Sequence, residues 1–361
     1  MARKKILTVV GARPQFVKAA VVSRALAEWG ENQEVLLHTG QHFDDNMSAI
    51  FFDELGIPPP TYNLGIGGGS HAANTGRAME AIERVINVEL PDFVLVYGDT
   101  DSTLAGALAA AKLSVPIAHV EAGLRSFNRR MPEEINRVLT DHLSAVLFAP
   151  SEAAVMNLSN EGIRGERVRL VGDVMFDAVK LFGKIAEQRS SILDRLELQK
   201  GGYILVTLHR QENVDDPKRL ASIIQGLSRS QRPVVFPLHP RTRKRITEFG
   251  IELDSPIRVI DPIGYLDMML LERNARVIAT DSGGVQKEAY FHGVPCLTLR
   301  DETEWVELVD IGVNRVVGAD SNAIGKALCE HEFDFAPTNI YGSGVSAEEI
   351  VGYMMRAMNN D

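Results

Sequence analysis

Short apolar runs alternate with longer amphipathic stretches along almost the whole chain. The runs cover residues 5–10, 34–38, 92–97, 116–120 and 145–148, and then 203–207, 233–237, 257–260, 276–280 and 295–299. Several are apolar at successive positions, as in Phe93-Val94-Leu95-Val96, which is typical of strands covered by helices on both faces. Strands that alternate with helices in this way form parallel sheets. The predicted fold class is therefore α/β, with two doubly wound Rossmann-like domains.

Chain length and the spacing of these runs predict where the domains divide. A chain of 361 residues is long for one core, and it suggests two domains. We expect an N-terminal domain over 1–172 and a C-terminal domain over 173–345. The remaining residues, 346–361, have an amphipathic pattern and are expected to form a helix that could pack back on the N-terminal domain.

Charge and composition argue against several classes of protein. The net charge of −10 disfavours a nucleic-acid partner or an anionic membrane surface. Cys296 and Cys329 form no disulfide framework, and neither they nor the scattered histidines have the spacing of metal ligands. The apolar run 6–10 is too short for a signal peptide, and no stretch offers the ~20 apolar residues that cross a bilayer. We expect a cytoplasmic protein with no membrane insertion and no metal.

A glycine turn in the second half predicts a phosphate site. Thr280-Asp281-Ser282-Gly283-Gly284 follows an apolar run and opens a helix, so backbone amides and the positive helix end could meet a diphosphate. Glu288, on the same helix, could accept hydrogen bonds from ribose hydroxyls, or it could be a solvated surface carboxylate. The turn lacks the P-loop lysine, and the first half lacks the three-glycine dinucleotide pattern, which disfavours ATP and NAD.

Three acids in the first half follow predicted strands or open a helix. Asp99 and Glu121 come directly after apolar runs, and Glu133 begins a helix after Pro132. Because the carboxyl ends of parallel strands meet at one edge, these acids could converge on one crevice. Each also has a simpler explanation: Asp99 or Asp101 could cap the next helix, and Glu133 could favour a helix dipole.

Basic and imidazole groups stand at similar places. Arg13 and Lys18 follow the first run, where they could hold a diphosphate or be ordinary surface charges. His209, past a strand of the second half, could bind phosphate, move a proton or satisfy a loop carbonyl. His239 is a weaker candidate and could be structural. The glycines of 67–71 form a loop before a helix, either a substrate lid or a plain connection.

Six motifs in order give the chain a specific resemblance. It closely resembles the non-hydrolysing UDP-N-acetylglucosamine 2-epimerases over essentially its whole length. The motifs that carry the resemblance are Gly11-Ala12-Arg13-Pro14, Gly40-Gln41-His42, Gly98-Asp99-Thr100, His119-Val120-Glu121-Ala122-Gly123-Leu124-Arg125, Pro132-Glu133-Glu134-Ile135-Asn136-Arg137 and Thr280-Asp281-Ser282-Gly283-Gly284. The resemblance implies a glycosyltransferase-B fold, a UDP-sugar in an interdomain active-site cleft, and a homodimer. It also implies inversion at C2 through loss and re-addition of UDP, with no cofactor.

The resemblance implies roles for matching residues. Acid-base chemistry falls to Asp99, Glu121 and Glu133, and His209 would assist departure of UDP. Substrate and phosphate groups would be held by Arg13, Lys18, His42 and Arg137. The nucleotide would contact Ser282, Gly283 and Gly284 through its diphosphate and Glu288 through its ribose. Which acid serves which face of C2 stays open.

Several positions depart from the usual pattern of this family. After Gln41-His42 the chain continues Phe43-Asp44-Asp45-Asn46, where an arginine is usual, so an activator site for a second UDP-N-acetylglucosamine is in doubt. Lys287 replaces an acid, and Trp305-Val306 replaces Arg-Pro. These variants resemble the branch that acts on UDP-2,3-diacetamido-2,3-dideoxyglucuronate for bacterial surface polysaccharide. Lys287 could meet the uronate carboxylate, or it could be a surface charge.

Other functions remain open at this point. UDP-N-acetylglucosamine is the alternative substrate for the same reaction. A hydrolysing 2-epimerase would release free sugar, and a glycosyltransferase of the same fold would need an acceptor. A non-catalytic sensor of UDP-sugars is the alternative from a different class, although binding alone does not require three acids together with His209.

Overall fold

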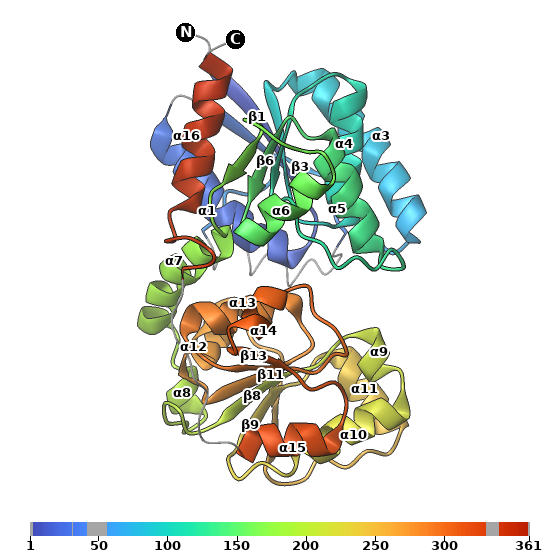
Figure 1. Ribbon diagram of the computed structural model, residues 1–361, viewed down its shortest axis with the longest axis vertical. Helices are drawn as coiled ribbons and strands as arrows, with labels where there is room; N and C mark the ends of the chain where they lie inside the picture. Colours follow the sequence, from blue (N-terminus) through green and yellow to red (C-terminus); the bar gives the residue numbers. More distant parts are fainter. Residues whose placement is uncertain (1–2, 31, 42–55, 330–338, 360–361) are drawn as a thin grey trace. The chain divides into compact units, whose positions relative to one another are not determined.

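The strands form two parallel sheets, one in each of two units of the chain. The computed structural model describes residues 3–30, 32–41, 56–329 and 339–359. One unit comprises Met1–Leu181 with Asn339–Asp361, and the other comprises Phe182–Thr338 (Figure 1). The two doubly wound α/β units predicted from the sequence are confirmed. The domain boundaries expected from the sequence, after residues 172 and 345, remain a prediction.

The first unit contains a seven-stranded sheet with every pairing parallel. In spatial order its strands are β3 (Tyr62–Asn63), β2 (Asn32–His38), β1 (Lys4–Val10), β4 (Phe93–Tyr97), β5 (Ile117–Val120), β6 (Val146–Ala149) and β7 (Val168–Leu170). Its helices are α1 (Arg13–Trp29), α3 (His71–Glu89), α4 (Asp101–Lys112), α5 (Pro132–Leu143), α6 (Glu152–Asn160) and α16 (Ser346–Asn359), with α7 (Val174–Arg189) leading into the second unit.

Side chains of successive residues in the central strands pack on opposite faces, as the continuous apolar runs predict. Leu7 and Val9 of β1 join a core with Ile82 of α3 and Ala105 of α4. Figure 1 shows α3, α4 and α5 along one face of this sheet, with α1 and α16 along the other. Both faces are therefore dry, which is why these strands carry no alternation of apolar and polar residues.

The C-terminal helix lies within the first unit. Helix α16 contacts α1. Its Tyr353 packs edge-on against Phe148 of β6, with ring centroids 5.9 Å apart, and the Arg169 guanidinium lies 4.5 Å from the Tyr353 ring centre. The Asp173 amide also donates to the Tyr341 carbonyl at 2.9 Å. Aromatic and cation–π contacts thus hold helix α16 against this sheet.

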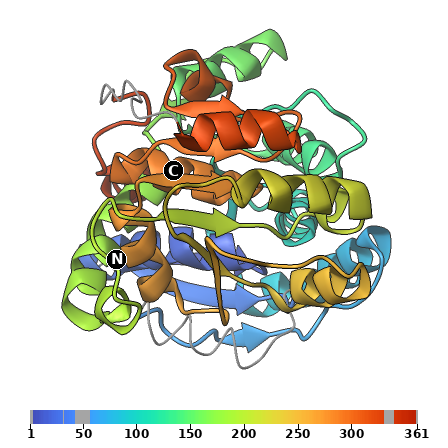
Figure 2. The ribbon, with the colours of Figure 1, turned by 90° about the horizontal axis from the view of Figure 1, so that it is seen from below.

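The second unit contains a six-stranded parallel sheet. In spatial order its strands are β10 (Ile257–Ile260), β9 (Val234–Pro237), β8 (Ile204–Thr207), β11 (Val277–Thr280), β12 (Cys296–Thr298) and β13 (Asn314–Val316). Its helices are α8 (Ile192–Arg195), α9 (Gln211–Val214), α10 (Pro217–Leu227), α11 (Pro240–Glu248), α12 (Tyr265–Asn274), α13 (Gly283–His292), α14 (Val306–Asp310) and α15 (Ser321–Cys329). Helices α10 and α15 lie side by side on one face of this sheet (Figure 2).

Each sheet has one point where the strand order reverses. In the first unit β1 pairs with both β2 and β4, and in the second β8 pairs with both β9 and β11. At such a point the following helices leave on opposite faces, so the turns at the carboxyl ends of the two strands are left uncovered and can bind a ligand. No helix in the described part of the chain is long and apolar enough to cross a membrane.

Candidate functional site

Gln15 joins the two turns at the switch point of the first unit. Its side-chain carbonyl accepts hydrogen bonds from the Gly11 and Ala12 amides at 2.7 and 3.0 Å, in the turn after β1. Its amide group donates to the Tyr97 carbonyl at the end of β4, at 2.7 Å. Gln15 is 1% exposed, so these bonds form away from water. Sequence reasoning missed Gln15, whose only signal was its place in the first turn of α1.

Lys18 and Glu121 form an ion pair beside the β4 turn. Both side chains are 8% exposed, so the interpretation of Lys18 as an ordinary surface charge is wrong. A methyl group added at Gly98 would lie 3.1 Å from Glu121 Oε2 and 3.6 Å from Lys18 Nζ, which places the pair directly against that turn. Glu121 has a φ of 71°, a left-handed conformation that is costly for a residue with a side chain.

Arg137 joins two acids in a second buried group. Its guanidinium donates to Asp99 and to Glu134, each at 2.6 Å, and its side chain is 6% exposed. Burial opposes the charge, but the two carboxylates outweigh it and raise the pKa of Arg137. Burial also works to raise the pKa of Glu134, yet the Ser126 amide and the Arg137 charge lower it below the ordinary value. Arg137 and Glu134 are therefore both charged at neutral pH.

The remaining candidates of the first unit lie in less defined surroundings. Glu133 is half-buried in the first turn of α5, where its charge also favours the helix dipole. Arg13 is the first residue of α1. The alternative explanation of Asp99 or Asp101 as the cap of the next helix is wrong, because Thr100 caps α4 by accepting from the Thr103 amide. His42 lies outside the described residues.

Asp281 organises the two turns at the switch point of the second unit. It is fully buried and accepts hydrogen bonds from the His209 amide at 3.1 Å and the Arg210 amide at 2.9 Å. The His209 ring lies beside the same carboxylate, with Nδ1 at 3.3 Å from Oδ1, and its side chain is 48% exposed. The His209 ring therefore contacts a carboxylate, and not the loop carbonyl that was the simpler alternative from the sequence. His239, the weaker candidate, caps α11.

The glycine turn opens α13, as predicted. Ser282 caps the helix by accepting from the Val285 amide. A methyl group at Gly283 would lie 2.3 Å from Glu304 Oε1, so a larger residue there would have to displace the Glu304 carboxylate. At Gly284 the nearest atom would be Ser282 Oγ at 3.9 Å, which leaves open space next to the backbone. Open space at the positive end of a helix is suited to an anion.

Lys287 and Glu288 are buried, and both interpretations as solvated surface groups are wrong. Lys287 is 1% exposed, and its Nζ lies 4.3 Å from the Trp305 ring centre. Glu288 is 7% exposed and accepts a hydrogen bond from the Tyr265 hydroxyl at 3.2 Å. Burial and the nearby charge of Glu288 together raise the pKa of Glu272 well above its ordinary value. Glu288 therefore sits in a dry environment beside an acid whose pKa is raised.

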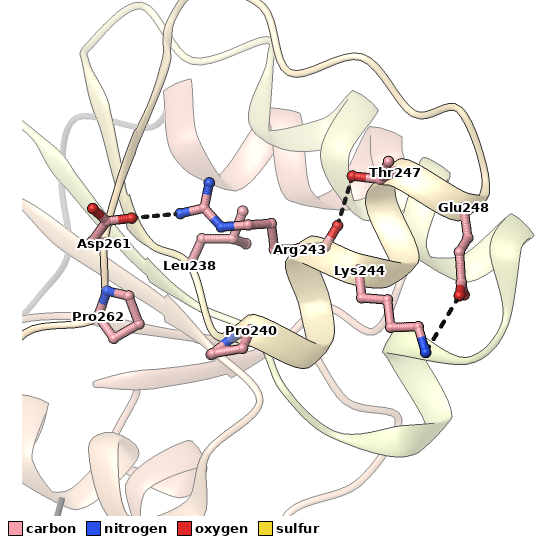
Figure 3. Close-up of a pocket in the computed structure, with 8 residues that line it drawn as sticks. All are labelled: Leu238, Pro240, Arg243, Lys244, Thr247, Glu248, Asp261 and Pro262. Carbon is pink, nitrogen blue, oxygen red and sulfur yellow. Dashed lines mark hydrogen bonds and ion pairs between the residues drawn. The ribbon is translucent and has the colours of Figure 1, made fainter. Parts of the chain in front are cut away.

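A cavity of about 520 Å³ lies elsewhere in the second unit, beside α11. Figure 3 shows its polar side chains already paired, with Arg243 bonded to Asp261 at 2.9 Å and Lys244 close to Glu248 at 3.7 Å. None of the predicted site residues lines it. Among the described residues, no group of three histidine, cysteine or acidic side chains is placed to hold a metal ion.

Comparison with known proteins gives one consistent family. Its sequence profile, described as UDP-N-acetylglucosamine 2-epimerase, matches residues 24–355. UDP-2,3-diacetamido-2,3-dideoxy-D-glucuronate 2-epimerase of Pseudomonas aeruginosa is 52% identical, over 98% of this chain and 99% of its own length. A UDP-N-acetylglucosamine 2-epimerase homolog of Methanococcus maripaludis is 51% identical, over 96% and 98%.

The solved structures agree with the sequence comparison. The crystal structure of Methanocaldococcus jannaschii UDP-GlcNAc 2-epimerase in complex with UDP-GlcNAc and UDP is 44% identical, with a TM-score of 0.89 over 98% of this chain and 99% of that one. The enzyme from Neisseria meningitidis bound to UDP-GlcNAc is 32% identical, with a TM-score of 0.89 over 98% and 100%.

Proposed function

The chain belongs to the UDP-N-acetylglucosamine 2-epimerase family, and from that premise we propose that its substrate is UDP-2,3-diacetamido-2,3-dideoxyglucuronate, which it converts to the manno epimer. The family makes it a UDP-sugar 2-epimerase, an isomerase acting on a carbohydrate. The observation that carries the substrate is the 52% identity to the Pseudomonas aeruginosa enzyme of that name, over 98% of this chain. The second candidate is UDP-N-acetylglucosamine, favoured by the 44% identity to the Methanocaldococcus jannaschii enzyme.

Chemistry dictates what the residues of such an enzyme must do. The C2 proton lies next to no carbonyl and is barely acidic. Cleavage of the bond between C1 and the UDP oxygen builds positive charge at C1, and a base then removes the C2 proton to leave a 2-acetamidoglycal. In the return step UDP rebuilds its bond to C1 and an acid returns a proton to the opposite face of C2. The reaction needs acid-base groups and a cationic hold on the diphosphate.

The first unit supplies the acid-base groups in this proposal. Glu121, Asp99 and Glu133 exchange protons with the sugar, and two of them already stand beside buried cations. Lys18 pairs with Glu121 and Arg137 pairs with Asp99. Arg13 and His42 are proposed to add substrate contacts.

The second unit supplies the nucleotide contacts. The amides of the turn from Ser282 through Gly284 are proposed to meet the diphosphate, since Gly284 leaves open space at the positive end of α13. Glu288, held by Tyr265, would accept hydrogen bonds from the ribose. The partly exposed His209 ring, oriented by Asp281, would assist departure of UDP.

The proposal also covers the use of the product, the cellular compartment and the oligomeric state. The manno product would feed synthesis of a bacterial surface polysaccharide such as O-antigen, in the cytoplasm, and the chain would act as a homodimer. Sedimentation velocity of the purified protein checks the assembly. A single species at twice the mass of one chain is expected, and a monomer at all concentrations would contradict it.

Lys287 gives a test of substrate preference. The substitution Lys287→Met keeps the volume and removes the charge, so we expect kcat/KM for the diacetamido-uronate to fall by at least about tenfold. The value for UDP-N-acetylglucosamine, which has no carboxylate, should change by less than about threefold. Equal losses for both sugars would mean that the lysine only supports Trp305. Lys244→Met, on exposed helix α11, serves as the control.

Incubation in deuterated water tests the proposed function directly. Each UDP-sugar is supplied separately, and C2 is followed by proton NMR. A manno product carrying deuterium at C2 from the uronate supports the proposal. The same product from UDP-N-acetylglucosamine alone would assign the second candidate. Release of free sugar and UDP would indicate a hydrolysing enzyme, a product formed only with an acceptor would indicate a glycosyltransferase, and binding without exchange would indicate a sensor.

A further inference from the structure

His119 makes two short hydrogen bonds in the interior of the first unit. It lies on β5 and is fully buried. Its Nδ1 is 2.7 Å from Asp141 Oδ1, and its Nε2 is 2.8 Å from the Gly98 carbonyl. A carbonyl oxygen only accepts hydrogen bonds, so Nε2 carries a proton. The charge on the ring then depends on which atom donates between His119 and Asp141.

Asp141 is the acceptor in that bond. Its other oxygen, Oδ2, accepts from Arg125 Nη1 at 2.7 Å and from the Gly123 amide at 3.1 Å. These two donors, one of them the charged Arg125 guanidinium, stabilise the ionised form of the Asp141 carboxyl. An ionised carboxylate has no proton to give, so Nδ1 of His119 must donate as well. Both ring nitrogens therefore carry protons, and the ring is an imidazolium.

The surrounding charges balance this buried cation. Arg125 Nε and Nη2 donate to the two Glu161 oxygens at 2.7 and 2.8 Å. Two cations, His119 and Arg125, thus face two anions, Asp141 and Glu161. Buried charges persist when they are paired and hydrogen-bonded. The side chains of His119, Asp141 and Arg125 are buried and paired in this way, and that of Glu161 is 27% exposed.

The partners of this network belong to the two turns that carry proposed acids. Gly98 immediately precedes Asp99, and Gly123 follows Glu121 by two positions. Both glycines have a positive φ, and so does Glu121. Of these three residues only Glu121 has a side chain, so its left-handed conformation is costly on its own and needs contacts that hold it. His119 reaches the first turn directly and the second through Asp141.

We propose that His119 is a permanently charged positioning residue, which ties the turn bearing Asp99 to the turn bearing Glu121. The proposal rests on the proposed function for the roles of those two acids. Its physical content is separate: a neutral imidazole could satisfy only one of the two acceptors and would leave the other unpaired in a dry interior.

The charge on the ring is tested by NMR on the wild-type protein, without substrate. Ring nitrogen–proton correlations are recorded on protein with ¹⁵N-labelled histidine, and the His119→Asn variant identifies the His119 signals. We expect two protonated ring nitrogens that exchange slowly with solvent and persist to pH 8. One protonated and one bare nitrogen would overturn the proposal, whatever the enzyme's activity.

Kinetics test the positioning role. His119→Asn is expected to lower kcat by roughly 10²-fold, because small displacements of reacting groups have effects of that order. UDP affinity, which the proposed function assigns to the second unit, should stay within about threefold. His142→Asn is the matched control: His142 lies on α5 with Nε2 3.4 Å from Glu161, but its side chain is 49% exposed. The control should keep kcat within about twofold.

The outcomes separate this inference from the proposed function. An unchanged kcat in His119→Asn would overturn the positioning role, and so would parallel losses of kcat and UDP affinity, which indicate general damage. A wild-type protein that epimerises neither UDP-sugar would overturn the proposed function, while the ring NMR would still report the imidazolium. If His119→Asn does not fold, Asp141→Asn replaces it, with loss of the second ring proton and a fall in kcat as the expected results.

Discussion

Replacing Glu121 with glutamine is expected to lower kcat by about 10³-fold while UDP affinity stays within about threefold. The amide keeps the shape of the side chain but cannot exchange a proton with C2, and acid-base groups contribute factors of this size. The change also leaves the buried Lys18 ammonium without its carboxylate, at a cost of about 3 kcal/mol in unfolding free energy. Initial rates, UDP titration calorimetry and urea unfolding measure the three effects.

Glu89→Gln is the matched control for loss of an ion pair. Glu89 accepts from Lys5 Nζ at 3.0 Å, near the start of β1 and far along the strand from the Gly11 turn. Both partners are more exposed than Lys18 and Glu121, so the expected cost is smaller, about 1 kcal/mol, with kcat unchanged. A Glu121→Gln enzyme with near-normal turnover would remove Glu121 from the acid-base set.

Local sequence was enough to predict the fold because its central strands are buried on both faces. A run such as 93–96 cannot alternate when helices cover both sides, and each of the ten runs identified from the sequence overlaps a strand. Strands β3, β7 and β13 lie outside these runs. They have two or three residues each and lie at sheet edges, where a strand is short and weakly patterned.

Candidate site residues that directly follow a strand could be predicted from the sequence. Contacts between residues far apart in the sequence could not, because only the packing of helices and loops brings them together. Asp99, Glu121 and the glycine turn were found because they stand at the carboxyl ends of strands. Asp141 was missed, because it lies in the last turns of α5, 22 residues after His119, and only the packing of α5 on β5 brings the two together. The burial of Lys287 was missed for the same reason: Trp305 covers it from a distant loop.

Gly123→Ala is expected to lower the unfolding free energy by more than about 3 kcal/mol and kcat by at least tenfold. Gly123 has a φ of 84°, and a methyl group there would lie 2.4 Å from the Ala154 carbonyl oxygen. Left-handed strain costs roughly 1–2 kcal/mol, and overpacking against rigid backbone adds roughly 1–3 kcal/mol. Relief of the clash would move the Gly123 amide off Asp141 and shift the turn that carries Glu121.

Gly162→Ala separates strain from steric clash. Gly162 has a φ of 79°, almost that of Gly123, but a methyl group there meets nothing within 4 Å. Its substitution should therefore cost only the left-handed strain, about 1 kcal/mol, with normal kcat. Urea unfolding and initial rates of both variants check the comparison. If the two alanines destabilise equally, contact with Ala154 does not limit this turn; if Gly123→Ala folds stably with full kcat, the geometry of the Glu121 turn does not control turnover.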